Sequence, residues 1–165
     1  MGYTHYWKHG KIALEKWQKI VKDVKRLYKI LPKHSHTAGD CYGDVPLKIQ
    51  YEYDKARPPV ANIDEIRFNG VGDMGHETLY IERIPHDYDG KRVKGRWMGF
   101  CKTARKPYDL AVQVVLLIVK HHVGKTFDLS SDGDDEDWSE ALSFTAKEYG
   151  YGFQSPLFKT DQMPN

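Results

Sequence analysis

Cysteine is scarce in this chain of 165 residues, in which Cys41 and Cys101 are the only two. Two cysteines make no disulfide framework, and their spacing fits neither a CxxC motif nor a zinc site. Long apolar runs are also missing, because the most apolar stretch, 110–119, contains Gln113 and is too short to span a bilayer. No charged segment followed by an apolar one opens the chain. We therefore expect a cytoplasmic protein with no membrane partner.

Net charge is small, +2 at pH 7, although the charges are unevenly distributed. Lysine and arginine dominate the first 34 residues, whereas residues 132–137 form an acidic run. Proteins that coat nucleic acid are basic over a whole face, so this balance argues against a partner such as bulk nucleic acid. The chain has 40% hydrophobic residues and 11 Tyr, enough apolar material for a core. We expect a single domain over 1–165, with 150–165 as a tail.

Hydrophobic periodicity predicts an α+β fold. The expected helices cover 12–31, 108–122 and a segment that begins at 131. The expected strands lie at 47–53, around 66–68, around 79–81, at 93–101 and at 127–129. This order predicts a mostly antiparallel sheet of about five strands with helices packed on one face, which is a two-layer sandwich with one βαβ crossover.

The opening segment is unusually aromatic, with Tyr3, Tyr6 and Trp7 around His5. Such apolar mass must be buried, so we expect this segment to enter the sheet as an edge strand, with His5 near residues 100–107, described next and called the basic loop. In a functional interpretation His5 would contact phosphate and Tyr3 would stack on a base. In a structural interpretation the segment is an anchor.

The strongest candidate for a binding site is the segment 100–107, which links an expected strand to an expected helix. It carries Lys102, Thr103, Arg105 and Lys106. A helix N-terminus offers free amide groups and a positive dipole end, and the cations would add charge-assisted bonds to an oxyanion. The alternative is a solvated turn whose cations pair with Asp109 or with the acidic run. The segment has no GxxxxGK[ST] glycines and is not a P-loop.

Catalytic motifs are incomplete. The triplet His76-Glu77-Thr78 matches the HxT pattern of two-histidine phosphoesterases, whose chemistry needs two copies, and the chain has one. The remaining histidines, His34 and His36 among them, have no HExxH or similar ligand spacing. The acidic run does not follow the alternation of a calcium loop. The sequence therefore predicts no metal and no cofactor, and it favours a protein that is not an enzyme.

Three segments, Met1–Trp7, Cys101–Asp109 and Ser131-Asp132-Gly133, resemble a family of small phage-encoded proteins of largely unassigned function. Phages encode small sponge proteins that sequester the nucleotide signals of bacterial immunity. The resemblance thus implies an anti-defence protein in the cytoplasm of an infected bacterium. Such a protein would hold a cyclic nucleotide or an ADP-ribose-like signal without cleaving it.

Three functional hypotheses follow. In the first, a small phosphorylated nucleotide is bound, with its base on aromatic side chains. The proposed ligand contacts are Tyr3, His5, Trp97, Lys102, Thr103, Arg105 and Lys106. In the second, the chain is a metal-independent phosphodiesterase in which His5 or His76 moves protons. In the third, it is an interaction domain that blocks a host factor. The sequence leaves open whether the chain forms a homo-oligomer.

Overall fold

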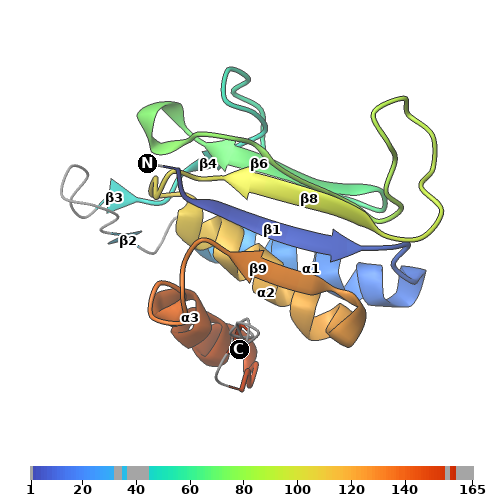
Figure 1. The fold of residues 1–165 in the computed structure, drawn as a ribbon. Coiled ribbons are helices and arrows are strands. Elements are labelled where there is room, and N and C mark those ends of the chain that lie inside the picture. Colours follow the sequence, from blue (N-terminus) through green and yellow to red (C-terminus); the bar gives the residue numbers. More distant parts are fainter. Residues whose placement is uncertain (1, 32–34, 37–44, 155–156, 159–165) are drawn as a thin grey trace, which may run out of the picture.

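A computed structural model describes residues 2–31, 35–36, 45–154 and 157–158 (Figure 1). The helices in these ranges are α1 (Leu14–Ile30), α2 (Asp109–Val123) and α3 (Ser139–Tyr149), with short 3-10 turns at η2 (Gly72–Met74) and η3 (Gly124–Thr126). None of the helices in the described ranges is both long and apolar enough to cross a membrane.

The strands fall into separate antiparallel sheets. Their bounds are β1 (Thr4–His9), β2 (Ser35–His36), β3 (Val45–Pro46), β4 (Ile49–Gln50), β5 (Val60–Ala61), β6 (Glu65–Gly70), β7 (Leu79–Glu82), β8 (Trp97–Lys102) and β9 (Asp128–Ser131). One sheet has the order β8-β1-β9, and in another β6 pairs with β4, β5 and β7. The short strands β2 and β3 pair with each other. The expected α+β class is confirmed.

A split βαβ unit organises the first sheet. Strands β8 and β9 both run antiparallel to β1, so they are parallel to each other with β1 between them. Helix α2 connects them and lies with α1 behind the sheet in Figure 1. The expected burial of α2 is confirmed, because Leu110, Val114, Leu117 and Ile118 are at most 3% exposed. One face of the sheet is thus covered by helices, as expected for a two-layer sandwich.

The aromatic opening segment forms the centre of this sheet, and the prediction of an edge strand was wrong. Strand β1 pairs with β8 on one side and with β9 on the other. Both neighbours come from segments roughly a hundred residues later in the chain, so no local sequence pattern predicts these strand pairings.

Two further expectations were wrong at element boundaries. The strand expected at 47–53 is reduced to β4, and the last helix begins at Ser139 and not at residue 131. Ser131 ends β9, and the acidic run after it forms a turn closed by its own side chains. In that turn the Asp134 amide donates to Asp137 Oδ2 and the Asp137 amide donates to Asp134 Oδ1. These local bonds compete with helical ones and delay the start of α3.

Candidate functional site

The two faces of β8 lie in different surroundings. Register places Trp97, Gly99 and Cys101 opposite His9, Trp7 and His5, on the face covered by helices. Met98, Phe100 and Lys102 lie on the other, open face, opposite Lys8, Tyr6 and Thr4. Residues paired across antiparallel strands share a face, so the strand divides into an inner and an outer row.

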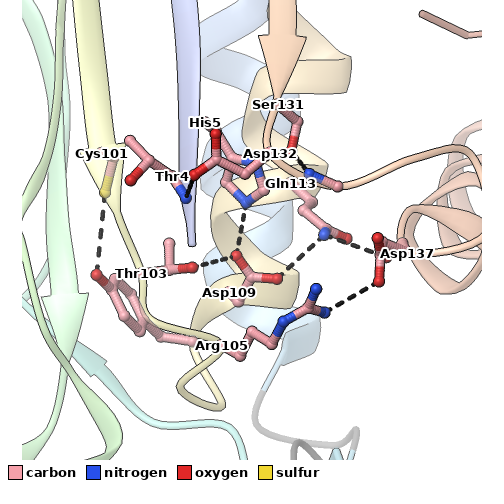
Figure 2. Close-up of polar contacts among 12 residues, drawn as sticks. Thr4, His5, Cys101, Thr103, Arg105, Asp109, Gln113, Ser131, Asp132 and Asp137 are labelled. Atoms are coloured by element: carbon pink, nitrogen blue, oxygen red, sulfur yellow. Dashed lines mark hydrogen bonds and ion pairs between the residues drawn. The ribbon is translucent and has the colours of Figure 1, made fainter. Parts of the chain in front are cut away.

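A buried polar cluster lies beyond the Lys102 end of β8, and Figure 2 shows its bonds. We define it as His5, Thr103, Asp109, Gln113 and Ser131. The His5 Nε2 atom lies 2.6 Å from Asp109 Oδ1, and His5 Nδ1 lies 2.8 Å from the Ser131 hydroxyl. Thr103 Oγ1 donates to Asp109 Oδ1 at 2.5 Å, and Gln113 Nε2 donates to Asp109 Oδ2 at 3.0 Å. This polar cluster joins β1, β9 and α2.

The polar cluster is closed to a ligand in this conformation. His5 and Thr103 are fully buried, and both ring nitrogens of His5 are engaged. Buried polar groups that are fully hydrogen-bonded fix the arrangement of the surrounding elements. A direct contact between His5 and phosphate would therefore require Asp109 or Ser131 to move away.

Amides of the basic loop, expected to be free for an oxyanion, already have acceptors within the protein. The amides of Thr103 and Ala104 both donate to the Tyr3 carbonyl, and the Lys106 amide donates to the Thr103 carbonyl. The first acceptor belongs to Tyr3, the residue before β1, which lies far from the loop in the sequence. Ala104 and Arg105 have φ values of 50° and 57°, a left-handed conformation that is uncommon outside glycine and that reverses the chain here.

Arg105 is engaged by the acidic run. Its guanidinium donates to Asp137 Oδ1 at 2.9 Å and lies 4.0 Å from the centre of the Tyr3 ring. The hydrogen bond from Arg105 is the main reason why the pKa of Asp137 is lowered. Tyr3 is only 3% exposed, and burial raises its pKa to about 12. Pairing of the loop with the acidic run is thus confirmed for Arg105, and Tyr3 has no open ring face for a base in this conformation.

The HxT triplet packs around Asn69. The Asn69 amide donates to the His76 carbonyl at 2.9 Å and to the Thr78 hydroxyl at 3.1 Å. His76 Nδ1 lies 3.0 Å from the Lys102 carbonyl, and His76 borders a shallow depression together with Lys106. This arrangement ties β7 to the end of β8.

Trp97 lies far from the basic loop, at the other end of β8, in a cavity of about 420 Å³ between β7 and β8. We call this cavity the aromatic cleft. Its aromatic lining comes from Trp7, Tyr80, Tyr88, Trp97 and Phe100. Tyr88 is 91% exposed and contacts Trp97 edge-on, with 5.5 Å between ring centres. The proposed ligand contacts therefore separate into Trp97 at one end of β8 and the rest at or beyond the other end.

Gly99 allows Trp7 to form the floor of the aromatic cleft. A Cβ atom at Gly99 would lie 2.5 Å from the Trp7 indole. The indole packs into the space that the absent side chain of Gly99 leaves, which is a common role of glycine within a strand.

Polar groups line the rim of the aromatic cleft. His86 Nδ1 lies 3.1 Å from Glu82 Oε1, and the Tyr80 hydroxyl donates to the same oxygen at 2.6 Å. An antiparallel bridge joins His86 to Arg92, so Lys91 and Arg92 lie beside residues that line the cleft. We call residues 91–96 the basic segment. Its cations, Lys91, Arg92, Lys94 and Arg96, are all exposed, and Arg96 is paired with Asp128 at 2.7 Å.

Metal ligands are not clustered in the described ranges, which contain no group of three His, Cys, Asp or Glu side chains able to hold an ion. Cys101 is buried and unpaired by disulfide, and burial raises the pKa of its thiol. His34 and Cys41 lie outside the described residues.

Comparison with known proteins supplies no relative. No family model matches the chain, and neither a curated protein nor a solved structure matches it. The site must therefore be interpreted from its own chemistry. The sequence did carry a signal for the cleft: cations at 91–96 stand between Tyr88 and Trp97, and basic residues interleaved with aromatic ones are typical of nucleotide-binding surfaces.

Proposed function

We propose that this protein binds a small phosphorylated nucleotide in the aromatic cleft and holds it without cleaving it. The observation that carries the proposal is the cleft itself, about 420 Å³ in volume, lined by Trp97, Tyr88 and Phe100 and bordered by the basic segment. Ligand sites are commonly concave and aromatic with a few polar groups, and they begin at about 300 Å³.

Stacking supplies the binding energy for the base in this proposal. Base–aromatic stacking contributes about 1–3 kcal/mol per base, and every base has a face that can stack. Phosphate oxygens would pair with Lys91 and Arg92 of the basic segment, which would form charge-assisted bonds to them. Trp97 keeps the role given to it by the sequence hypothesis, whereas the closed state of the polar cluster favours a structural role for His5 and Thr103.

Sequestration fits this chemistry better than hydrolysis. His5 is buried with both ring nitrogens bonded, and His76 packs against the Lys102 carbonyl. Together with the resemblance to small phage-encoded proteins, this supports an anti-defence role in which an immune nucleotide signal is removed from the host cytoplasm.

One observation favours a second candidate, a metal-independent phosphodiesterase. His86 lies 3.1 Å from Glu82 in the wall of the aromatic cleft and is partly exposed, with 37% of its side chain accessible. A histidine beside a carboxylate is a usual arrangement for proton transfer. Analysis of what the protein releases separates this candidate from sequestration.

The test is a binding screen with recovery of the ligand. The protein is incubated with mononucleotides, cyclic nucleotides and ADP-ribose, the unbound fraction is removed, and the bound fraction is heated and chromatographed. Intact nucleotide supports sequestration, and altered nucleotide supports the phosphodiesterase. If no nucleotide is retained, the proposal fails, and the hypothesis of a protein-interaction domain is favoured.

Tryptophan fluorescence localises the ligand in the same screen. Trp7, Trp17 and Trp138 are at most 3% exposed, whereas Trp97 is only partly buried. A base that stacks in the aromatic cleft should quench Trp97, and Trp97→Leu should abolish the change. Tyr53→Leu is the matched control, because Tyr53 is 57% exposed and lies outside the cleft.

A further inference from the structure

The outer face of α1 carries a row of lysines. Lys19, Lys22, Lys25 and Lys29 are all exposed, and each is three or four residues from the next. Side chains at these intervals are neighbours on the surface of a helix, one turn after another. We call these four residues the lysine stripe. It extends over about 15 Å of the helix at a rise of about 1.5 Å per residue.

The acids of α1 do not neutralise the lysine stripe. Asp23 lies 2.7 Å from His122 Nε2 and also accepts a bond from the Tyr151 hydroxyl. Glu15, the other acid of α1, lies in its first turn. None of the four lysines forms an ion pair with a residue that the structure describes, so their charge is available to a partner.

The fold separates the two signs of charge. The balance over the whole chain argued against a nucleic-acid partner, but the acidic run lies between β9 and α3 and binds Arg105, whereas α1 packs against α2 and β5. Cations gathered along one helix are typical of surfaces that bind a phosphate backbone. The charge of this face, and not that of the chain, decides what it attracts.

The residues of this face favour a duplex over other polyanions. Protein interfaces are depleted in lysine and enriched in aromatic residues, and single strands are held by bases stacked on aromatic rings. The aromatic residues of α1 are not available for either role. Trp17 is fully buried, and Tyr28 is partly buried with its hydroxyl donating to the Val60 carbonyl. Phosphates on the outside of a duplex need only the cations.

The apolar face of α1 is not available to a membrane. A helix that lies on a lipid surface inserts its apolar side chains between the headgroups. In α1 those side chains belong to the core, where Ile20, Val24 and Leu27 are 0% exposed. A membrane would therefore meet charge alone.

We infer that the lysine stripe binds the phosphate backbone of duplex nucleic acid without reading its sequence. Arginine is the usual side chain for reading a base edge, and Arg26 is instead held by Glu148 at 3.4 Å and by the Tyr149 ring at 4.8 Å. Lysines on phosphate position a protein on a duplex and carry no sequence information. This inference goes beyond the proposed function and does not depend on it, because no residue of α1 is among those that line the aromatic cleft.

The experiment measures affinity as a function of salt. The probes are two labelled DNA duplexes of different sequence, an RNA duplex, one of the DNA single strands, polyglutamate and phosphatidylserine vesicles. The logarithm of the binding constant falls by about 0.9 for each phosphate contacted per tenfold rise in salt, so four lysines predict a slope near −3.6. Affinity for a DNA duplex should therefore fall roughly 150-fold between 50 and 200 mM salt. The two DNA sequences should bind equally, and DNA against RNA identifies the kind of duplex.

A triple variant assigns the contacts to α1. Lys22→Gln/Lys25→Gln/Lys29→Gln should bind a duplex at least tenfold more weakly at 50 mM salt, with a slope shallower by about 2.7. Lys8→Gln/Lys55→Gln/Lys125→Gln is the matched control, because it removes the same charge from exposed lysines outside α1 and should keep a slope within about one unit of the wild type. Glutamine is a good helix former, and melting curves check that both variants are folded.

The outcomes separate this inference from the proposed function. A slope shallower than about −1 in the wild type would overturn the inference without any variant, since it would mean about one phosphate contact. Equal slopes for the two triple variants would overturn the assignment to α1. Tighter binding of vesicles, polyglutamate or the single strand than of either duplex would overturn the class of partner. The triple variant of α1 should retain the nucleotide of the aromatic cleft with unchanged affinity, and loss of that nucleotide would contradict the independence of the two surfaces.

Discussion

The two ends of β8 show how a satisfied polar site differs from an open one. Beyond Lys102, groups that looked ready for phosphate are bonded within the protein: His5 to Asp109, the Arg105 guanidinium to Asp137, and two loop amides to the Tyr3 carbonyl. At Trp97, exposed aromatic rings surround a cavity beside cations that face solvent. The first arrangement stabilises the fold, and the second leaves surface and charge for a ligand. The types of residue alone did not separate these two cases.

The largest expected effect comes from breaking the polar cluster. Asp109→Ala removes the acceptor of His5, Thr103 and Gln113, and leaves polar groups buried without partners. Removing one member of a buried ionic or hydrogen-bonded pair costs about 3–5 kcal/mol. Urea unfolding should show a loss of that size in the free energy of unfolding.

A surface carboxylate serves as the control for that variant. Glu15→Gln changes an exposed acid of α1 and should stay within about 0.5 kcal/mol of the wild type. A loss below about 1 kcal/mol for Asp109→Ala would show that the polar cluster does not stabilise the fold.

The floor of the aromatic cleft gives the next effect. Gly99→Ala places a methyl group against the Trp7 indole, and overpacking of this kind costs about 1–3 kcal/mol. The indole must also shift into or away from the cleft, so nucleotide affinity should change as well. Gly152→Ala is the matched control, because no atom lies within 4 Å of the Cβ position at Gly152. Equal melting temperatures for Gly99→Ala and the wild type would contradict the packing at Gly99.

Acid should lower the stability of the protein through His9, which lies on the helix-covered face of the sheet. Burial lowers the pKa of His9, whose side chain is 4% exposed, below its unfolded value of about 6.5. A lowered histidine pKa means that the unfolded chain binds the proton more readily. This contribution to stability is therefore present above about pH 6.5 and is lost as the pH falls toward the lowered value. Melting temperatures between pH 8 and pH 5 should fall less steeply for His9→Gln than for the wild type, and equal slopes would refute the prediction.

The smallest effect is expected at Arg105. Its side chain is 61% exposed, and exposed ion pairs contribute about 0–1 kcal/mol. Arg105→Ala should therefore lower stability by no more than that, and less at high salt. A larger loss in urea unfolding would show that Arg105 holds the left-handed turn in place.

The fold could be predicted where its signal is local. The apolar run of 110–119 predicted a buried helix, and alternation around Ile66 and Leu79 predicted strands that the structure contains. The central position of β1 could not be predicted, because its neighbours lie far along the chain. The acidic run 132–137, predicted as the first turn of the last helix, is instead closed as a separate turn by its own side chains.

The site was predicted only in part for a related reason. The basic residues of 100–107 were visible in the sequence, but the Tyr3 carbonyl that accepts bonds from the loop amides comes from the residue before β1. Trp97 was identified as an aromatic candidate, whereas its neighbours Tyr88 and Tyr80 were not, since a long loop brings them together. Contacts between distant segments decide which polar groups remain free, and these contacts cannot be predicted from the composition of a segment.

The central claim is that the ligand lies at the Trp97 end of β8, and a titration of two variants tests it most directly. The nucleotide recovered in the screen is titrated into wild type, Trp97→Leu and the double variant Lys102→Ala/Arg105→Ala, each with a melting curve. Trp97→Leu loses one stacking contact and should bind the nucleotide roughly 5- to 150-fold more weakly than the wild type. The double variant should lose less than about tenfold. If the basic loop held the phosphate, two lost charge-assisted bonds of about 1.5–3 kcal/mol each would cost it a hundredfold or more. That loss, with unchanged binding by Trp97→Leu, would contradict the account.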